Sequence, residues 1–254
     1  MKQKTFYLIF CACIITGCMD STLITENNPV QNESKACTAG SRTFQFPVLQ
    51  WENFENYDQK IAACQIPEAI LPNIPTDELI EICMEYPLLF DAYAFNTPLA
   101  GLKIVVSRFN GFQELMSRED NCLCTFNFLK EQNFKETDFS KLTKAEEGKI
   151  TLNYALCEYL ISFDEILHNA TDAIRKDIAR YAYQTLEFKE SQKQNFAWND
   201  LTASVYLCAK MSSINKWQTK STNPALNDFL ATGVLQDMKQ FNDIKQQCRI
   251  LIQD

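Results

Sequence analysis

Residues 72–120 read PNIPTDELIEICMEYPLLFDAYAFNTPLAGLKIVVSRFNGFQELMSRED and contain the start and stop signals of consecutive short helices. Thr76 is suited to cap a helix, and two acidic residues follow it where a helix N-terminus attracts negative charge. Pro87 ends this helix, because proline lacks an amide hydrogen and disfavours the α conformation in the residue before it. Thr97 followed by Pro98 predicts a second helix with a cap and a proline in its first position.

Apolar residues after Pro98 recur at helical spacing and form one stripe, made of Leu99, Leu102, Val105, Val106 and Phe109. Gly111 is expected to end this run, and Phe112 to begin another short helix. Short helices joined by tight breaks are typical of an α-hairpin array or an irregular bundle.

Further helices are expected in the remainder of the chain: at residues 121–132, after a capping box of Thr143 with Glu146, from about Thr171, after Asp200, at Asn223 with Pro224, and over the last residues. Only six glycines occur and two-residue alternation is scarce, so a large sheet is not expected. The sequence therefore predicts an all-α fold, a single irregular multi-helix domain over residues 46–254. An α-hairpin array or a HEAT-like solenoid is the alternative, although no fixed repeat period is found.

Residues 44–51 are the one stretch that could form a short extended segment. We favour a loop that places its apolar side chains on the helices, namely Phe46, Val48, Leu49 and Trp51.

Part of residues 72–120 also resembles known sequences. The runs LIEICMEYPLL, FNTPLAGL and SRFNGFQELMSRED, within residues 74–120, resemble a stretch that recurs in predicted secreted proteins and lipoproteins of Bacteroides-type bacteria. The resemblance covers about a fifth of the chain. It implies a class of organism and a helical domain, and it carries over no catalytic residues.

The N-terminus has the parts of a secretory signal. Two lysines precede an apolar run at residues 6–15, which is too short to span a bilayer as a permanent helix. The Ile-Thr-Gly-Cys that ends at Cys18 resembles the bacterial lipobox, which implies a signal peptide at residues 1–17 and lipid on Cys18. The alternative is an ordinary signal peptide with an incidental cysteine.

Residues 18–45 have few large apolar side chains, so this segment cannot bury enough surface to offset its ordering entropy. We expect it to be a tether between the acylated Cys18 and the helical domain. Met19 after the lipobox cysteine resembles outer-membrane sorting in bacteria that use that rule. The expected location is the bacterial cell envelope, at the outer membrane, with the membrane as a partner through the lipid and with the periplasmic or surface-exposed face left open.

Cysteine is frequent, at eleven residues. An exported chain meets an oxidising compartment, and Cys37 and Cys64, outside the main helical stripes, are the expected disulfide pair. Other cysteines fall on apolar stripes where a free thiol packs as a small hydrophobe: Cys83, Cys157, Cys208 and Cys248. Cys122 and Cys124 lack the Cys-x-x-Cys redox spacing.

His168 is the only histidine, so a two-histidine metal motif cannot form and no metal or other cofactor is expected. We expect His168 at the end of a helix, where an imidazolium interacts favourably with the last carbonyls. Asp164 and Glu165 could be an acid pair for glycoside hydrolysis, but a solvated acidic face is the favoured interpretation.

The chain is acidic, with a formal net charge of −8, and it contains no glycine-rich phosphate loop. Nucleic-acid binding is therefore not expected, because phosphate backbones repel such a chain. Trp51, Trp198 and Trp217 could stack on sugars if exposed, although burial is the commoner role.

Without a catalytic constellation, we expect a non-enzymatic binding or scaffold module for a protein or glycan partner. A carboxylate-based hydrolase is one alternative, with Glu114, Glu119 and Asp120 as the first candidate residues. An accessory subunit of an envelope complex is the other.

Overall fold

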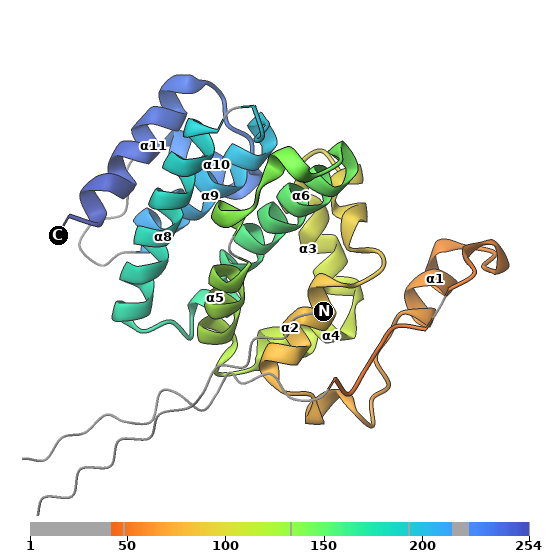
Figure 1. Ribbon diagram of the computed structural model, residues 1–254. Helices are drawn as coiled ribbons and strands as arrows, with labels where there is room; N and C mark the ends of the chain where they lie inside the picture. Colours follow the sequence, from red (N-terminus) through yellow and green to blue (C-terminus); the bar gives the residue numbers. More distant parts are fainter. Residues whose placement is uncertain (1–41, 48, 133, 193, 215–223, 254) are drawn as a thin grey trace, which may run out of the picture. The chain divides into compact units, whose positions relative to one another are not determined.

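The computed structural model describes residues 42–47, 49–132, 134–192, 194–214 and 224–253, and these residues form helices and connecting segments without a strand (Figure 1). The α-helices are α1 (Tyr57–Ala63), α2 (Thr76–Met84), α3 (Pro98–Arg108), α4 (Asn110–Ser117), α5 (Asn121–Glu131), α6 (Lys144–Ile161), α7 (Asp164–Leu167), α8 (Asp172–Ser191), α9 (Trp198–Ile214), α10 (Pro224–Thr232) and α11 (Met238–Leu251). Short 3-10 helices lie between them: η1 (Trp51–Asn53), η2 (Leu71–Asn73), η3 (Leu89–Ala94), η4 (Phe134–Glu136) and η5 (Phe139–Lys141). The all-α prediction is confirmed.

Two helices, α6 and α9, form the centre of the domain. Residues 154–161 of α6 and residues 200–209 of α9 are buried without interruption, so each helix is covered on all sides over about two turns. A helix that is buried all round belongs to the interior of a domain. The two helices also pack against each other.

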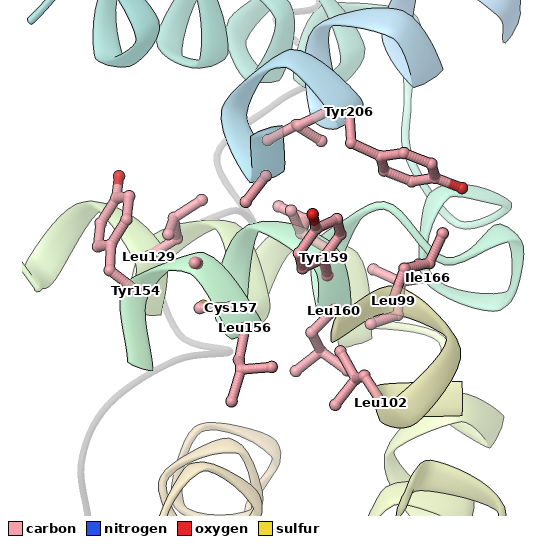
Figure 2. Close-up of a cluster of buried hydrophobic side chains, with 14 of the residues drawn as sticks. Leu99, Leu102, Leu129, Tyr154, Leu156, Cys157, Tyr159, Leu160, Ile166 and Tyr206 are labelled. Atoms are coloured by element: carbon pink, nitrogen blue, oxygen red, sulfur yellow. The ribbon is translucent and has the colours of Figure 1, made fainter. Parts of the chain in front are cut away.

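The remaining helices cover this pair. Helices α3, α5 and α7 pack on α6, whereas α8, α10 and α11 pack on α9. Figure 2 shows side chains from several of these helices around α6: Leu99 and Leu102 of α3, Leu129 of α5, Ile166 of α7 and Tyr206 of α9. Contacts between helices far apart in the chain, such as α6 with α9, depart from the nearest-neighbour stacking of a solenoid. The domain is an irregular multi-helix bundle, as the sequence predicts.

The stretch 72–120 forms consecutive short helices, with one corrected cap. The hydroxyl of Thr97 accepts a hydrogen bond from the Ala100 amide at 3.2 Å, so the predicted cap of α3 is confirmed. Thr76 is instead the first residue of α2, and its hydroxyl donates to Asp120 Oδ1 at 2.8 Å. The prediction of Thr76 as a cap was wrong because a distant carboxylate engages its hydroxyl.

Glycines in this stretch permit close packing and do not end helices. Gly111, expected as a breaker, lies inside α4, and the break falls one residue before that helix, at Phe109. Gly101 lies inside α3, where a Cβ would come within 2.0 Å of the Ala92 carbonyl oxygen. Only glycine therefore lets η3 lie directly on α3.

Other predicted helix starts are confirmed. Thr143 and Glu146 form a capping box at the start of α6, and Thr171 caps α8. Pro224 is the first residue of α10. Gly233 follows that helix with φ of +74°, the left-handed conformation that glycine adopts readily after a helix end.

The segment before η1 is a docked loop, as favoured from the sequence. The Phe46 ring lies 5.9 Å from the Phe109 ring and 6.1 Å from the Tyr86 ring, centroid to centroid. Leu49 and Trp51 are also packed against the core. Val48 lies outside the described residues.

No helix among the described residues has both the length and the apolar character needed to cross a membrane.

Candidate ligand-binding pocket

A cavity of about 320 Å³ lies among α1, η3 and α3, and we call it the aromatic pocket. Its walls are mostly apolar and its few polar groups come from separate elements. The lining residues are Tyr57, Ile61, Tyr86, Asp91, Ala94, Phe95, Ile104, Val105 and Arg108. Concave apolar sites with a few convergent polar groups are typical of ligand-binding pockets.

Tyr57 lies at the edge of the pocket and is 40% exposed. It is the first residue of α1, a helix capped by Asn56, whose side chain accepts from the Gln59 amide. The Tyr57 hydroxyl donates to Asp91 Oδ2. Burial is the larger cause, and this hydrogen bond the second, that raises the pKa of Tyr57 to about 12. The phenol therefore stays neutral and remains a donor to the Asp91 carboxylate.

Tyr86 supplies a hydroxyl to the wall of the pocket. Its ring stacks on Phe109 at 4.2 Å between centroids, and the residue is only 3% exposed. Burial raises the pKa of Tyr86, with a further contribution from Tyr57 and Asp91, which also line the cavity. Within the described part of the chain, the Tyr86 hydroxyl has no hydrogen-bond partner. A neutral donor is therefore available to a ligand.

Arg108 brings the positive charge. It is the last residue of α3 and is exposed, and its guanidinium lies over the Tyr57 ring at 5.9 Å from the centroid. None of the described acidic residues forms an ion pair with it. An exposed guanidinium on an aromatic face, next to apolar walls, is suited to an anionic group on an otherwise apolar ligand.

A second set of polar residues is buried in the centre and has a structural role. Lys189 Nζ lies 2.7 Å from Glu158 Oε2, with both side chains 1% exposed. Ser204 Oγ donates to Glu158 Oε1 at 2.6 Å, and Lys189 Nζ donates to the Asp200 carbonyl at 3.0 Å. This network joins α6, α8 and α9. None of its members lines the aromatic pocket, so we assign it to the packing of the central helices.

Two of the three carboxylates suspected from the sequence, Glu114 and Asp120, have structural partners. Glu114 forms an ion pair with Arg118 at 3.0 Å. Asp120 accepts from the Thr76 hydroxyl. Glu119 is exposed. None of these three residues is among the described residues that line the aromatic pocket.

Asp164 and Glu165 are both exposed, as expected for a solvated acidic face. Asp164 is 80% exposed at its side chain and pairs with Lys210 Nζ at 2.7 Å. With Glu165 it lines a separate cavity of about 500 Å³. His168 follows α7 as its C-terminal cap, as the sequence predicts.

The expected disulfide between Cys37 and Cys64 is wrong, because Cys64 is a free cysteine. Cys64 is a free, fully buried thiol, and Cys37 lies outside the described residues. Cys124 of α5 is disulfide-bonded instead. Spacing along the chain could not rank these cysteines, because pairing requires the two Cβ atoms to approach within about 4.5 Å in space. Cys18, the expected lipidation site, also lies outside the described residues.

Comparisons of this chain with protein-family models, with curated proteins and with solved structures give no match.

Little in the amino-acid sequence indicates the aromatic pocket. Pro87 marks Tyr86 only as the residue before a proline, and Arg108 is one of 24 basic residues in the chain. The residues that meet in the cavity are separated by up to fifty-one positions and belong to three helices and the segments between them. Hydrophobic periodicity reports on each helix alone, so it cannot place such residues together.

Proposed function

We propose that this chain is a non-enzymatic binding module of the bacterial cell envelope, moored through a lipid on Cys18. In this proposal residues 1–17 are the signal peptide and residues 18–45 are the tether. The lipobox-like end of the apolar run supports the anchor. The aromatic pocket supports the binding role.

The single observation that carries the proposal is the unpaired guanidinium of Arg108 beside an apolar cavity. The chain has a net charge of −8, and Arg108 supplies a local positive charge at this cavity that attracts an anionic group. The Tyr86 hydroxyl adds a donor within the cavity. The complementary group is an aromatic or aliphatic side chain of a protein, flanked by a carboxylate.

A protein segment fits this pocket better than a sugar does. Ile61, Ile104 and Val105 present aliphatic walls that offer no hydrogen bonds to sugar hydroxyls. An aromatic side chain that enters the pocket buries roughly 150–250 Å². At about 25 cal/mol per Å² that is about 4–6 kcal/mol before the cost of association, which leaves a weak anchor that needs neighbouring contacts.

Capture from envelope fractions tests the proposal. The intact lipoprotein is compared with Arg108→Glu, and Lys103→Glu is the matched control because it makes the same charge change at another exposed position of α3. We expect Arg108→Glu to lose the bound protein and Lys103→Glu to retain it. Phe95→Ala, which shortens an exposed wall of the pocket, should also weaken capture.

Equal capture by all three variants would contradict this function. A bound protein whose interacting segment has no carboxylate near its buried apolar side chain would contradict the proposed chemistry. The anchor is tested separately by Cys18→Ser, which should release the protein from membranes.

A further inference from the structure

A third cavity, of about 170 Å³, lies between the start of α3, the start of α9 and the segment after α10 (Figure 1 shows these helices). We call it the Trp198 slot. Trp198, Asn96, Thr202 and Val234 are among the residues that line it. It is smaller than the roughly 300–1,000 Å³ of typical ligand pockets, so it can hold one small group.

Trp198 is held in place on one side and open on the other. Its ring lies 5.6 Å from the Phe241 ring of α11, at an interplanar angle of 32°. It is nevertheless 42% exposed. Within the described residues its indole N–H has no hydrogen-bond partner. A large exposed aromatic ring that is fixed by a neighbouring ring provides a platform for stacking at low entropic cost.

The polar groups of the slot are neutral and partly open. Asn96 is exposed, and its side-chain amide, with two donors and one acceptor, makes no hydrogen bond to another described residue. The Thr202 hydroxyl donates to the Trp198 carbonyl at 2.9 Å and keeps its lone pairs. Among the described residues that line the slot, none is charged. A ligand with a formal charge would leave that charge unmatched here.

The hydroxyl of Thr97, by contrast, has a structural role in the wall. It donates to the Thr232 carbonyl at 3.1 Å and accepts from the Ala100 amide. This bond ties the start of α3 to the end of α10, and Gly233 with its positive φ then turns the chain toward Val234. The slot is therefore built from fixed backbone and not from one loop.

We infer that the Trp198 slot binds one neutral pyranose ring of a glycan. A pyranose has an apolar face of C–H groups that stacks on an aromatic ring, and an edge of hydroxyls that need donors and acceptors. Trp198 supplies the first, and Asn96, Thr202 and the indole N–H supply the second. An apolar side chain would leave these polar groups without partners in a dry contact.

This site is separate from the aromatic pocket in its residues and in its chemistry. The aromatic pocket has a guanidinium and aliphatic walls, and the slot has a neutral amide and hydroxyls. A module with both sites could hold a protein through one and a glycan through the other.

A glycan array of neutral and acidic oligosaccharides, followed by titration calorimetry with the best neutral ligand, tests the inference. We expect binding of at least one neutral glycan by the intact chain. Trp198→Ala should weaken it at least tenfold, Trp198→Phe should retain part of it, and Asn96→Ala should weaken it severalfold. Trp51→Ala is the matched control, because Trp51 is a half-buried tryptophan outside the slot.

Thermal unfolding of each variant shows whether the domain still folds. Asn96→Ala changes only an exposed side chain, so this variant still tests the inference if Trp198→Ala is unfolded. The inference is overturned if no neutral glycan binds, if only acidic glycans bind, or if binding is unchanged in both Trp198→Phe and Asn96→Ala. Arg108→Glu should leave glycan binding unchanged, so failure of the protein-binding proposal does not affect this result.

Discussion

Replacement of Lys189 by methionine is the sharpest perturbation of the central helices. Lys189 Nζ is the only described cation within ion-pair distance of Glu158, and both side chains are 1% exposed. Methionine keeps most of the length and the apolar stem but removes the charge. Glu158 would keep only the hydrogen bond from Ser204.

The expected loss follows from an uncompensated buried charge. Breaking a buried ion pair by removing one partner typically costs about 3–5 kcal/mol, because the remaining ion stays desolvated. For a domain of this size each kcal/mol corresponds to about 2–4 °C in the melting temperature. We therefore expect Lys189→Met to lower the melting temperature by roughly 10 °C.

Circular dichroism at increasing temperature and in urea measures this loss. The double variant Glu158→Leu with Lys189→Met removes both charges and should regain most of the stability, because apolar replacement of a buried pair is often neutral. Arg180→Met is the control, since it breaks an exposed pair with Asp177 and should change the free energy of unfolding by less than about 1 kcal/mol.

The pH dependence has a defined sign. Burial raises the pKa of Glu158, and Lys189 lowers it in part. In Lys189→Met the effect of Lys189 is gone and only the hydrogen bond from Ser204 still lowers the pKa of Glu158, so that pKa rises further. The folded variant then binds more protons than the unfolded chain above the ordinary glutamate pKa of about 4.3. Stability of the variant should then fall as pH rises from about 4.5 to 7.5 more than that of the parent. A loss below about 1 kcal/mol, or one independent of pH, would refute the reasoning.

Three further predictions concern the packing and the thiols. Gly101→Ala should destabilise the domain by about 1–3 kcal/mol in urea unfolding, because its Cβ would meet the Ala92 carbonyl at 2.0 Å; unchanged stability would contradict the close approach of η3. Alkylation of the native protein at pH 8, followed by peptide mass spectrometry, should leave the buried free thiols unmodified. The reason is that burial raises the pKa of Cys64 to about 11 and that of Cys122 to about 12. Rapid labelling of either thiol would contradict their burial in the core. The peptide that carries Cys124 should be recovered in a disulfide-linked form and released only after reduction, and its recovery as a free thiol from unreduced protein would contradict the bond.

Local signals along the chain predict the helices. The caps and helix ends that they miss are determined by contacts between residues far apart in the chain. Thr97 and Thr143 cap helices through atoms three residues away, so their sequence context was sufficient. Thr76 was misassigned because its hydroxyl is engaged by Asp120, forty-four positions away. A glycine in a helical pattern predicts a break but does not reveal which side chain lies beside it, so the prediction of a helix end at Gly111 was wrong.

The sites are harder to predict from the sequence than the helices, because they also depend on contacts between residues far apart in the chain. Glu158 and Lys189 lie thirty-one positions apart on different helices, and an isolated charge in an apolar run does not identify its partner. The aromatic pocket needs α1, η3 and α3 in their final places before Tyr57 meets Arg108. Trp198 was named as a possible sugar platform, but its exposure depends on how α11 packs beside it.

A titration of the isotope-labelled protein with phenylacetate, followed by NMR, tests most directly whether the aromatic pocket binds an apolar group next to an anionic one. We expect resonances of Tyr57, Phe95 and Arg108 to shift together, with a dissociation constant in the millimolar range, or about −4 kcal/mol. The neutral analogue benzyl alcohol should bind more weakly, and Arg108→Glu should abolish the preference for the acid. Shifts confined to other parts of the chain, or equal binding of both compounds by the parent protein, would contradict the account.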